Sequence, residues 1–345
     1  MTESRAELGQ RGDEDLTDWL VRIPKAELHL HLEGAIPLDA MWELIQKYGG
    51  DPSLPSVEAL AERFQFRDFP HFLQLWIWKN QFLREYEDFT YMSQAFARCL
   101  AQQNIRYAEV FFSPVRFVDE GLEIPRLFES IRAGLSSTPE VEVALIADLV
   151  RDYGPDRALG TLRDVNEIKD DGIFGIGLGG GEHNFPPELF PTVYREAREM
   201  GFRTTAHAGE AAGPPSVWGA IHELGVERIG HGARSGEDET LLDYLVEHQI
   251  PLELCPISNI KTGVIDSIEQ HPVRRYFDKG VLLTINTDDP MMFGNSLVDE
   301  YRALIEVHGF TKDDVKTLIL NAVKASWLSD ERKEQLVGEF AAELE

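Results

Sequence analysis

The segment PKAELHLHLEG, residues 24–34, carries two histidines, His29 and His31, separated by a single leucine. Residues two apart in a β-strand point to the same face, so both imidazoles can reach one point, as metal ligands do. The residues around the pair are apolar, which predicts a buried strand. Unpartnered histidines would be costly to desolvate there. The pattern leaves two interpretations open: a metal site, or a core strand whose histidines are hydrogen-bonded.

Short β-rich runs recur along the rest of the chain, separated by segments of helical periodicity. With the first, the runs are AELHLHL (26–32), IRYAEVFF (105–112), VEVALIADL (141–149), IFGIGL (173–178), FRTTAH (202–207), ERIGH (227–231), IPLELC (250–255) and VLLTINT (281–287). Strands that alternate with helices are typical of a parallel sheet, and eight of them predict a (β/α)₈ TIM barrel.

Two long segments fall outside this alternation. Residues 33–104 are too many for one loop, so we expect extra helices inserted after the first strand. A C-terminal helical region is expected over residues 297–345. The polar residues 1–15 predict a flexible N-terminal arm, and the absence of a linker predicts one barrel domain over residues 16–345.

The amino-acid composition indicates which kinds of molecule the protein can bind. The formal net charge of −27 would repel phosphate backbones and anionic lipids, which argues against nucleic acid and membrane surfaces. There is no apolar run long enough to cross a bilayer and no secretory signal. The two cysteines, Cys99 and Cys255, suit a reducing compartment. We therefore expect a cytoplasmic protein that acts on a small molecule.

Polar side chains gather at four of the predicted strand ends. In a barrel, the loops at the carboxyl ends of the strands build the active site. The residues there are His29 and His31, His207 and Glu210, His231, and Asp288 and Asp289. Three histidines and an aspartate at one barrel mouth would suit zinc or another divalent transition metal.

The motifs HLHLEG (29–34), HAGE (207–210), RIGHG (228–232) and NTDDP (286–290), in this order, resemble the adenosine deaminase family of the amidohydrolase superfamily. The resemblance spans residues 24–336 and implies a zinc-dependent barrel that hydrolyses the amine from a purine. It implies His29, His31, His207 and Asp288 as metal ligands. Relatives with two metals carry a lysine at the end of the fourth strand, and residues 175–182 hold none, so we expect one zinc ion per chain.

The resemblance also implies a role for each catalytic group. A zinc-activated water, whose pKa falls from 15.7 to about 7, would attack purine C6. Glu210 would donate a proton to the neighbouring ring nitrogen N1, for which the carboxyl group must be protonated in the complex. His231 would orient or deprotonate the water, and Asp289 would take a hydrogen bond from the substrate ring or from water.

Further residues are implied as substrate contacts. Gly180, in the glycine-rich GLGGGE (177–182), would donate its backbone N–H to the purine ring, and Glu182 would support that loop. Phe72, Leu73 and Trp76 follow helical spacing and would form an apolar lid over the barrel mouth.

Glu33 bears on the choice of substrate. Adenosine-using relatives commonly carry aspartate there, bonded to a ribose hydroxyl, whereas glutamate also occurs in relatives that take free adenine. HAGEAAGP (207–214) and RIGHGAR (228–234) resemble nucleoside-type members, so the sequence ranks deamination of adenosine, or a substituted adenosine, to inosine first. The alternatives are deamination of adenine to hypoxanthine, or an aminodeoxyfutalosine deaminase. A non-catalytic purine-binding barrel is disfavoured because every catalytic position is filled.

Overall fold

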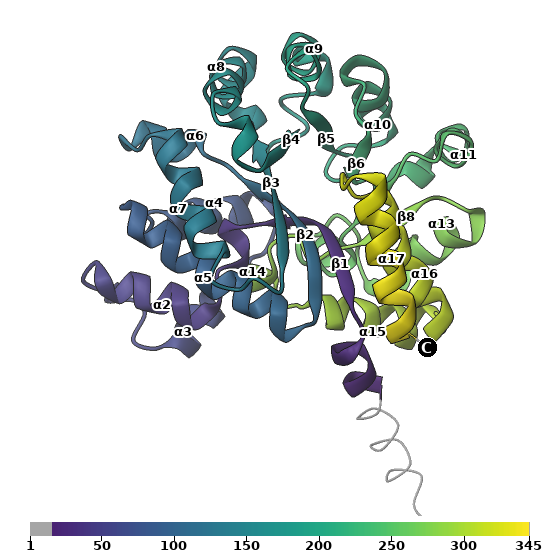
Figure 1. The fold of residues 1–345 in the computed structure, drawn as a ribbon, viewed down its shortest axis with the longest axis horizontal. Helices are drawn as coiled ribbons and strands as arrows, with labels where there is room; N and C mark the ends of the chain where they lie inside the picture. The colour runs from purple at the N-terminus through teal and green to yellow at the C-terminus, as the bar shows by residue number, and fades with distance from the viewer. Residues whose placement is uncertain (1–15, 345) are drawn as a thin grey trace, which may run out of the picture.

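The computed structural model describes residues 16–344, so the arm predicted at residues 1–15 lies outside the described residues. Eight parallel strands follow one another in sequence order around a barrel (Figure 1). They are β1 (Lys25–His31), β2 (Ile105–Phe112), β3 (Glu142–Asp148), β4 (Ile173–Gly177), β5 (Arg203–Ala208), β6 (Arg228–His231), β7 (Leu252–Leu254) and β8 (Leu283–Ile285). The predicted (β/α)₈ barrel is confirmed. That residues 16–345 form a single domain stays a prediction.

Helices surround the barrel (Figure 1). After β1 come the expected extra helices, and a helical region follows β8. The α-helices are α2 (Leu38–Lys47), α3 (Val57–Arg63), α4 (Phe69–Asn80), α5 (Tyr86–Gln102), α6 (Val115–Asp119), α7 (Ile124–Leu135), α8 (Gly154–Asn166), α9 (Pro191–Glu199), α10 (Pro214–Gly219), α11 (Glu239–His248), α12 (Pro256–Lys261), α13 (Val273–Lys279), α14 (Pro290–Phe293), α15 (Leu297–His308), α16 (Lys312–Ala325) and α17 (Asp330–Leu344). Among the described residues, none of these helices is long and apolar enough to span a membrane.

The first strand contains an irregularity that matters for the site. The register between β1 and β2 shifts between Glu27 and Leu30, as at a β-bulge. There the backbone N–H groups of Leu28 and His29 both donate to Oδ1 of Asn286, at 2.9 and 3.1 Å. A side chain from the end of β8 therefore takes up the hydrogen bonds that the bulge frees.

The barrel closes where β1 meets the residues after β8. The backbone N–H of His31 donates to the carbonyl oxygen of Asp288 at 2.8 Å, and the N–H of Asp288 donates to that of His29 at 3.1 Å. These two bonds flank a parallel bridge between Leu30 and Asp288. The first and last strands are thus joined at the level of the functional side chains.

Candidate active site

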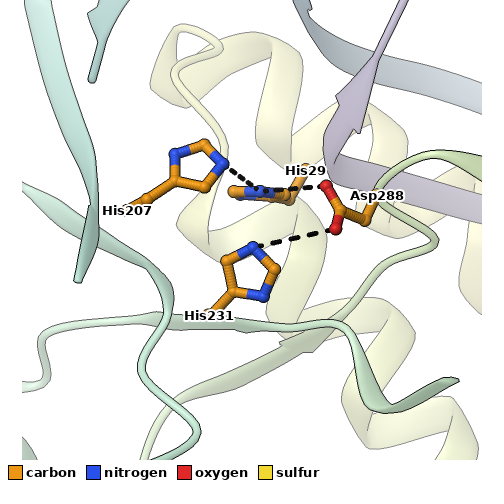
Figure 2. A group of neighbouring side chains, drawn as sticks. All are labelled: His29, His207, His231 and Asp288. Atoms are coloured by element: carbon orange, nitrogen blue, oxygen red, sulfur yellow. Dashed lines mark hydrogen bonds and ion pairs between the residues drawn. The ribbon is translucent and has the colours of Figure 1, made fainter. Parts of the chain in front are cut away.

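A cluster of histidines and one aspartate lies at the carboxyl ends of the strands (Figure 2). Nε2 of His207 lies 3.1 Å from Nε2 of His29 and 3.1 Å from Nε2 of His31. Oδ1 of Asp288 lies 3.4 Å from Nε2 of His31 and 3.8 Å from Nε2 of His29. Nε2 of His231 lies 3.8 Å from the other carboxylate oxygen of Asp288, Oδ2. The structure therefore brings all four predicted metal ligands together.

This spacing fits a single divalent ion. Ligand atoms about 2.1 Å from a tetrahedral zinc lie about 3.4 Å from one another, close to the distances between these nitrogen and oxygen atoms. All the side chains are buried, so a cation would compensate the desolvated Asp288 carboxylate. Burial lowers the pKa of His29 and His207 well below the usual range, which keeps both rings in the neutral form that binds metals. Imidazole and carboxylate donors suit zinc.

The ring of His29 is held by a buried carboxylate. Its Nδ1 lies 2.7 Å from Oε2 of Glu253, which orients the ring and leaves Nε2 free to face the cluster. Glu253 is held in turn by Arg228, whose Nε donates to Oε1 at 2.5 Å. The same guanidinium lies 2.6 Å from Glu109 and 3.7 Å from the centre of the Trp327 ring. A ligand on β1 is therefore anchored through β6, β7 and the segment that precedes α17.

Glu210 lies beside the cluster as a buried acid. Burial, reinforced by the charge of Asp288, raises its pKa well above the usual range, which favours the protonated carboxyl group. Glu182, predicted to support its own glycine-rich loop, instead accepts from the backbone N–H groups of Gly209 and Ala212, at 2.6 and 2.8 Å. It therefore fixes the loop that presents Glu210.

Asp289 is a second buried acid, adjacent in sequence to Asp288. Burial and the Asp288 charge raise its pKa to about 8. Its Oδ1 has no hydrogen-bond partner among the described residues. A Cβ atom at Gly34 would lie 1.6 Å from that oxygen, so only glycine leaves room for the carboxyl group. Such a pKa favours a protonated carboxyl group, which can donate as well as accept a hydrogen bond. The acceptor role expected from the sequence stays a prediction.

A cavity of about 90 Å³ opens onto the cluster. Of the predicted substrate contacts, Gly180, Phe72, Leu73, Trp76 and Asp289 lie in its wall, but Glu33 does not. Gly180 adopts a φ of +101°, in the left-handed region that favours glycine.

Three cavity-lining residues were missed by the sequence reasoning: Ser113, Asp148 and Val150. All lie at or just after the ends of β2 and β3, a position that could have singled them out. Oδ2 of Asp148 accepts from the Ser113 hydroxyl at 3.0 Å, and its Oδ1 accepts from the backbone N–H of Gly179 at 2.7 Å.

Backbone strain is concentrated at this site. Val150, His231 and Asp288 have φ values of 46°, 58° and 65°, which non-glycine residues rarely adopt. For β-branched Val150 such a conformation is especially unfavourable. Strain of this kind persists where the surrounding structure enforces it, often at functional sites.

A parallel barrel whose open end gathers imidazoles, a carboxylate and protonated acids around a cation site has the construction of a metal-dependent (β/α)₈ hydrolase. The family model described as adenosine deaminase matches residues 24–343. The chain belongs to the adenosine deaminase family and is a hydrolase acting on C–N bonds.

Individual relatives and structures cover almost the whole chain. A protein named adenine deaminase from Bordetella parapertussis is 36% identical over 315 residues, covering 89% of this chain and 98% of the relative. The crystal structure of adenine deaminase from Arthrobacter aurescens superposes with a TM-score of 0.89 at 33% identity, covering 93% of this chain and 98% of that one. An amidohydrolase structure from Burkholderia ambifaria, with bound zinc, has a TM-score of 0.87 at 27% identity over 100% of this chain and 94% of that one.

Proposed function

We propose that this protein hydrolyses free adenine to hypoxanthine and ammonia. The proposal departs from the first-ranked expectation of adenosine. Relatives that share about a third of their residues with this chain, over nearly its full length, are named adenine deaminases. The site supplies the groups that purine deamination needs.

The placement of Glu33 is the observation that carries the choice of a base over a nucleoside. Its side chain is fully buried, and Oε1 accepts from the backbone N–H of Ser113 at 2.9 Å. The buried ammonium of Lys79 donates to the Glu33 carbonyl oxygen at 2.6 Å. The other carboxylate oxygen, Oε2, has no hydrogen-bond partner among the described residues. The side chain nevertheless lies outside the cavity wall, so it is not presented to a ribose hydroxyl.

The charges in the cavity wall disfavour a phosphorylated substrate. Asp148, Glu210, Asp288 and Asp289 line the cavity, and among the described lining residues there is no lysine or arginine. A phosphate group would find no cationic side chain in this wall to compensate its charge, which is unfavourable in a desolvated site.

His29, His31, His207 and Asp288 would hold the metal. When bound, a divalent ion lowers the pKa of water and so supplies a nucleophile at neutral pH. The protein's own groups then handle the remaining protons. Protonated Glu210 donates to N1 as attack at C6 places charge on that nitrogen, and protonated Asp289 donates a hydrogen bond to a ring nitrogen. Gly180 presents its backbone N–H to the ring edge.

The substrate assignment predicts a clear preference among purines. With zinc-loaded protein, kcat/KM for adenine should exceed that for adenosine by about 100-fold or more, because Glu33 offers the ribose no partner. The ultraviolet change on deamination measures both rates. Protein carrying Glu210→Gln, purified identically, controls for contaminating deaminases. Faster turnover of adenosine, deoxyadenosine or aminodeoxyfutalosine than of adenine would refute the assignment.

Gly34→Ala tests the position of Asp289. The added methyl group would collide with the Asp289 carboxyl oxygen and displace it. Because a shift of about 1 Å can cost on the order of 100-fold in rate, kcat/KM for adenine should fall by about that factor. Zinc content should stay unchanged, since Asp289 is not among the expected ligands. A variant with wild-type kinetics would show that Asp289 needs no fixed position.

A further inference from the structure

Two buried side chains connect His231 to a backbone N–H group outside the cavity wall. Nδ1 of His231 lies 3.2 Å from Nδ2 of Asn259, on α12. Oδ1 of the same amide lies 3.2 Å from Nε2 of His271, just before α13. The backbone N–H of Val273 donates to Nδ1 of His271 at 3.3 Å. Asn259 is fully buried and His271 is 3% exposed, so water does not compete for these contacts.

The backbone N–H of Val273 determines which group donates and which accepts in each of these hydrogen bonds. A backbone N–H can only donate, so Nδ1 of His271 must be the acceptor, and the proton of that neutral ring is on Nε2. His271 then donates to the amide oxygen of Asn259, whose NH₂ group donates to His231. Nδ1 of His231 is therefore an acceptor, and its proton is on Nε2.

That proton faces the site. Nε2 of His231 is buried and has no hydrogen-bond partner among the described residues, and it lies 3.8 Å from both Oε2 of Glu210 and Oδ2 of Asp288. His271 itself carries no charge, because burial and the nearby imidazoles lower its pKa to about 3. These hydrogen bonds therefore set which nitrogen of His231 is protonated, and they add no charge to the cluster.

We propose that Asn259 and His271 are positioning residues that fix His231 in the Nε2–H tautomer, so that it faces the substrate as a hydrogen-bond donor. A donor at this point can orient the attacking oxygen and stabilise the negative charge that develops on it. This catalytic consequence rests on the proposed function, whereas the tautomer does not.

Asn259→Asp tests the proposal with almost no change of shape. A carboxylate accepts at both oxygens, so it would still receive the His271 proton but would draw a proton onto Nδ1 of His231. That exchange leaves an unprotonated Nε2 facing the site. We expect kcat for adenine to fall by about 10²- to 10⁴-fold, the range associated with a lost or wrongly placed proton, with little change in KM.

The tautomer is read directly from long-range ¹H–¹⁵N correlation spectra of the zinc-loaded protein labelled with ¹⁵N-histidine. A His231→Asn variant identifies the His231 signals among the ten histidines. Wild-type protein should show Nε2–H at His231, and Asn259→Asp should show Nδ1–H. Asn295→Asp is the matched control: this amide donates to Thr287 and Glu300 instead, so the exchange should leave the His231 tautomer unchanged.

Each outcome has a defined meaning. Nδ1–H in place of Nε2–H at His231 in the wild-type protein would overturn the proposal, as would Asn259→Asp protein that folds, retains zinc and shows no proton on Nδ1 of His231. If the tautomer switches as expected but the wild-type protein deaminates no purine, the positioning chain stands and the proposed function fails. Should Asn259→Asp not fold, the wild-type spectrum alone still decides the tautomer.

Discussion

Glu210→Gln should lower kcat for adenine by about 10²- to 10⁴-fold, the usual contribution of a positioned proton donor. Burial raises the pKa of the Glu210 carboxyl group well above its usual range, which favours the protonated form that can give its proton to N1. The glutamine amide has a similar shape and can still form hydrogen bonds, but it cannot transfer a proton. Binding should therefore change much less than kcat.

Steady-state kinetics and metal analysis together check this result. Zinc content should match that of the wild-type protein, because Glu210 is not among the expected ligands. Glu237→Gln is a matched control outside the cavity, where Glu237 pairs with Arg234, and its kcat should stay within about twofold. Wild-type turnover by Glu210→Gln would rule out Glu210 as the proton donor.

Removal of the metal should abolish turnover, and added zinc should restore it. Because the four expected ligands come from β1, β5 and the segment after β8, zinc should also stabilise the folded barrel. At a free zinc concentration 100-fold above Kd, the expected gain is about 2.7 kcal/mol, visible as a rise in Tm. Chelation followed by titration with zinc, monitored by calorimetry, measures this gain.

Substitution of the two neighbouring aspartates, one at a time, shows which of them binds the metal. Asp288→Asn should weaken zinc binding by more than the 10- to 100-fold typical of a lost outer-shell partner. Asp289→Asn, the same exchange one residue later, should leave zinc binding unchanged. The reverse pattern would mean that the ligand is Asp289, which also lies within reach of His31.

The barrel could be predicted because its signals are local. Each strand is a short apolar run, and alternation with helical periodicity is enough to indicate parallel pairing. The histidine pair of β1 could likewise be predicted to share a face, and Nε2 of each ring lies 3.1 Å from Nε2 of His207. Residues at strand ends converge in any such barrel, which is why His207 and Asp288 were found.

The remaining features depend on contacts between distant segments. Nothing in the sequence around Glu33 reveals that its carboxylate turns toward the Ser113 backbone, and this direction bears on the choice of substrate. The raised pKa of Asp289 is equally hidden, because it comes from burial beside Asp288. Asp148 lies at the end of β3, but it belongs to none of the sequence motifs that predicted the site.

The closure of the barrel by residues 29–31 and 288 has a consequence for biosynthesis. A ribosome makes the histidines of β1 among the first residues and Asp288 more than 250 residues later. Until then the nascent chain offers only an incomplete set of ligands, with the edge of β1 unpaired on one side. Stable capture of the metal must therefore wait until the chain is almost finished, so that a truncated product would be released without it.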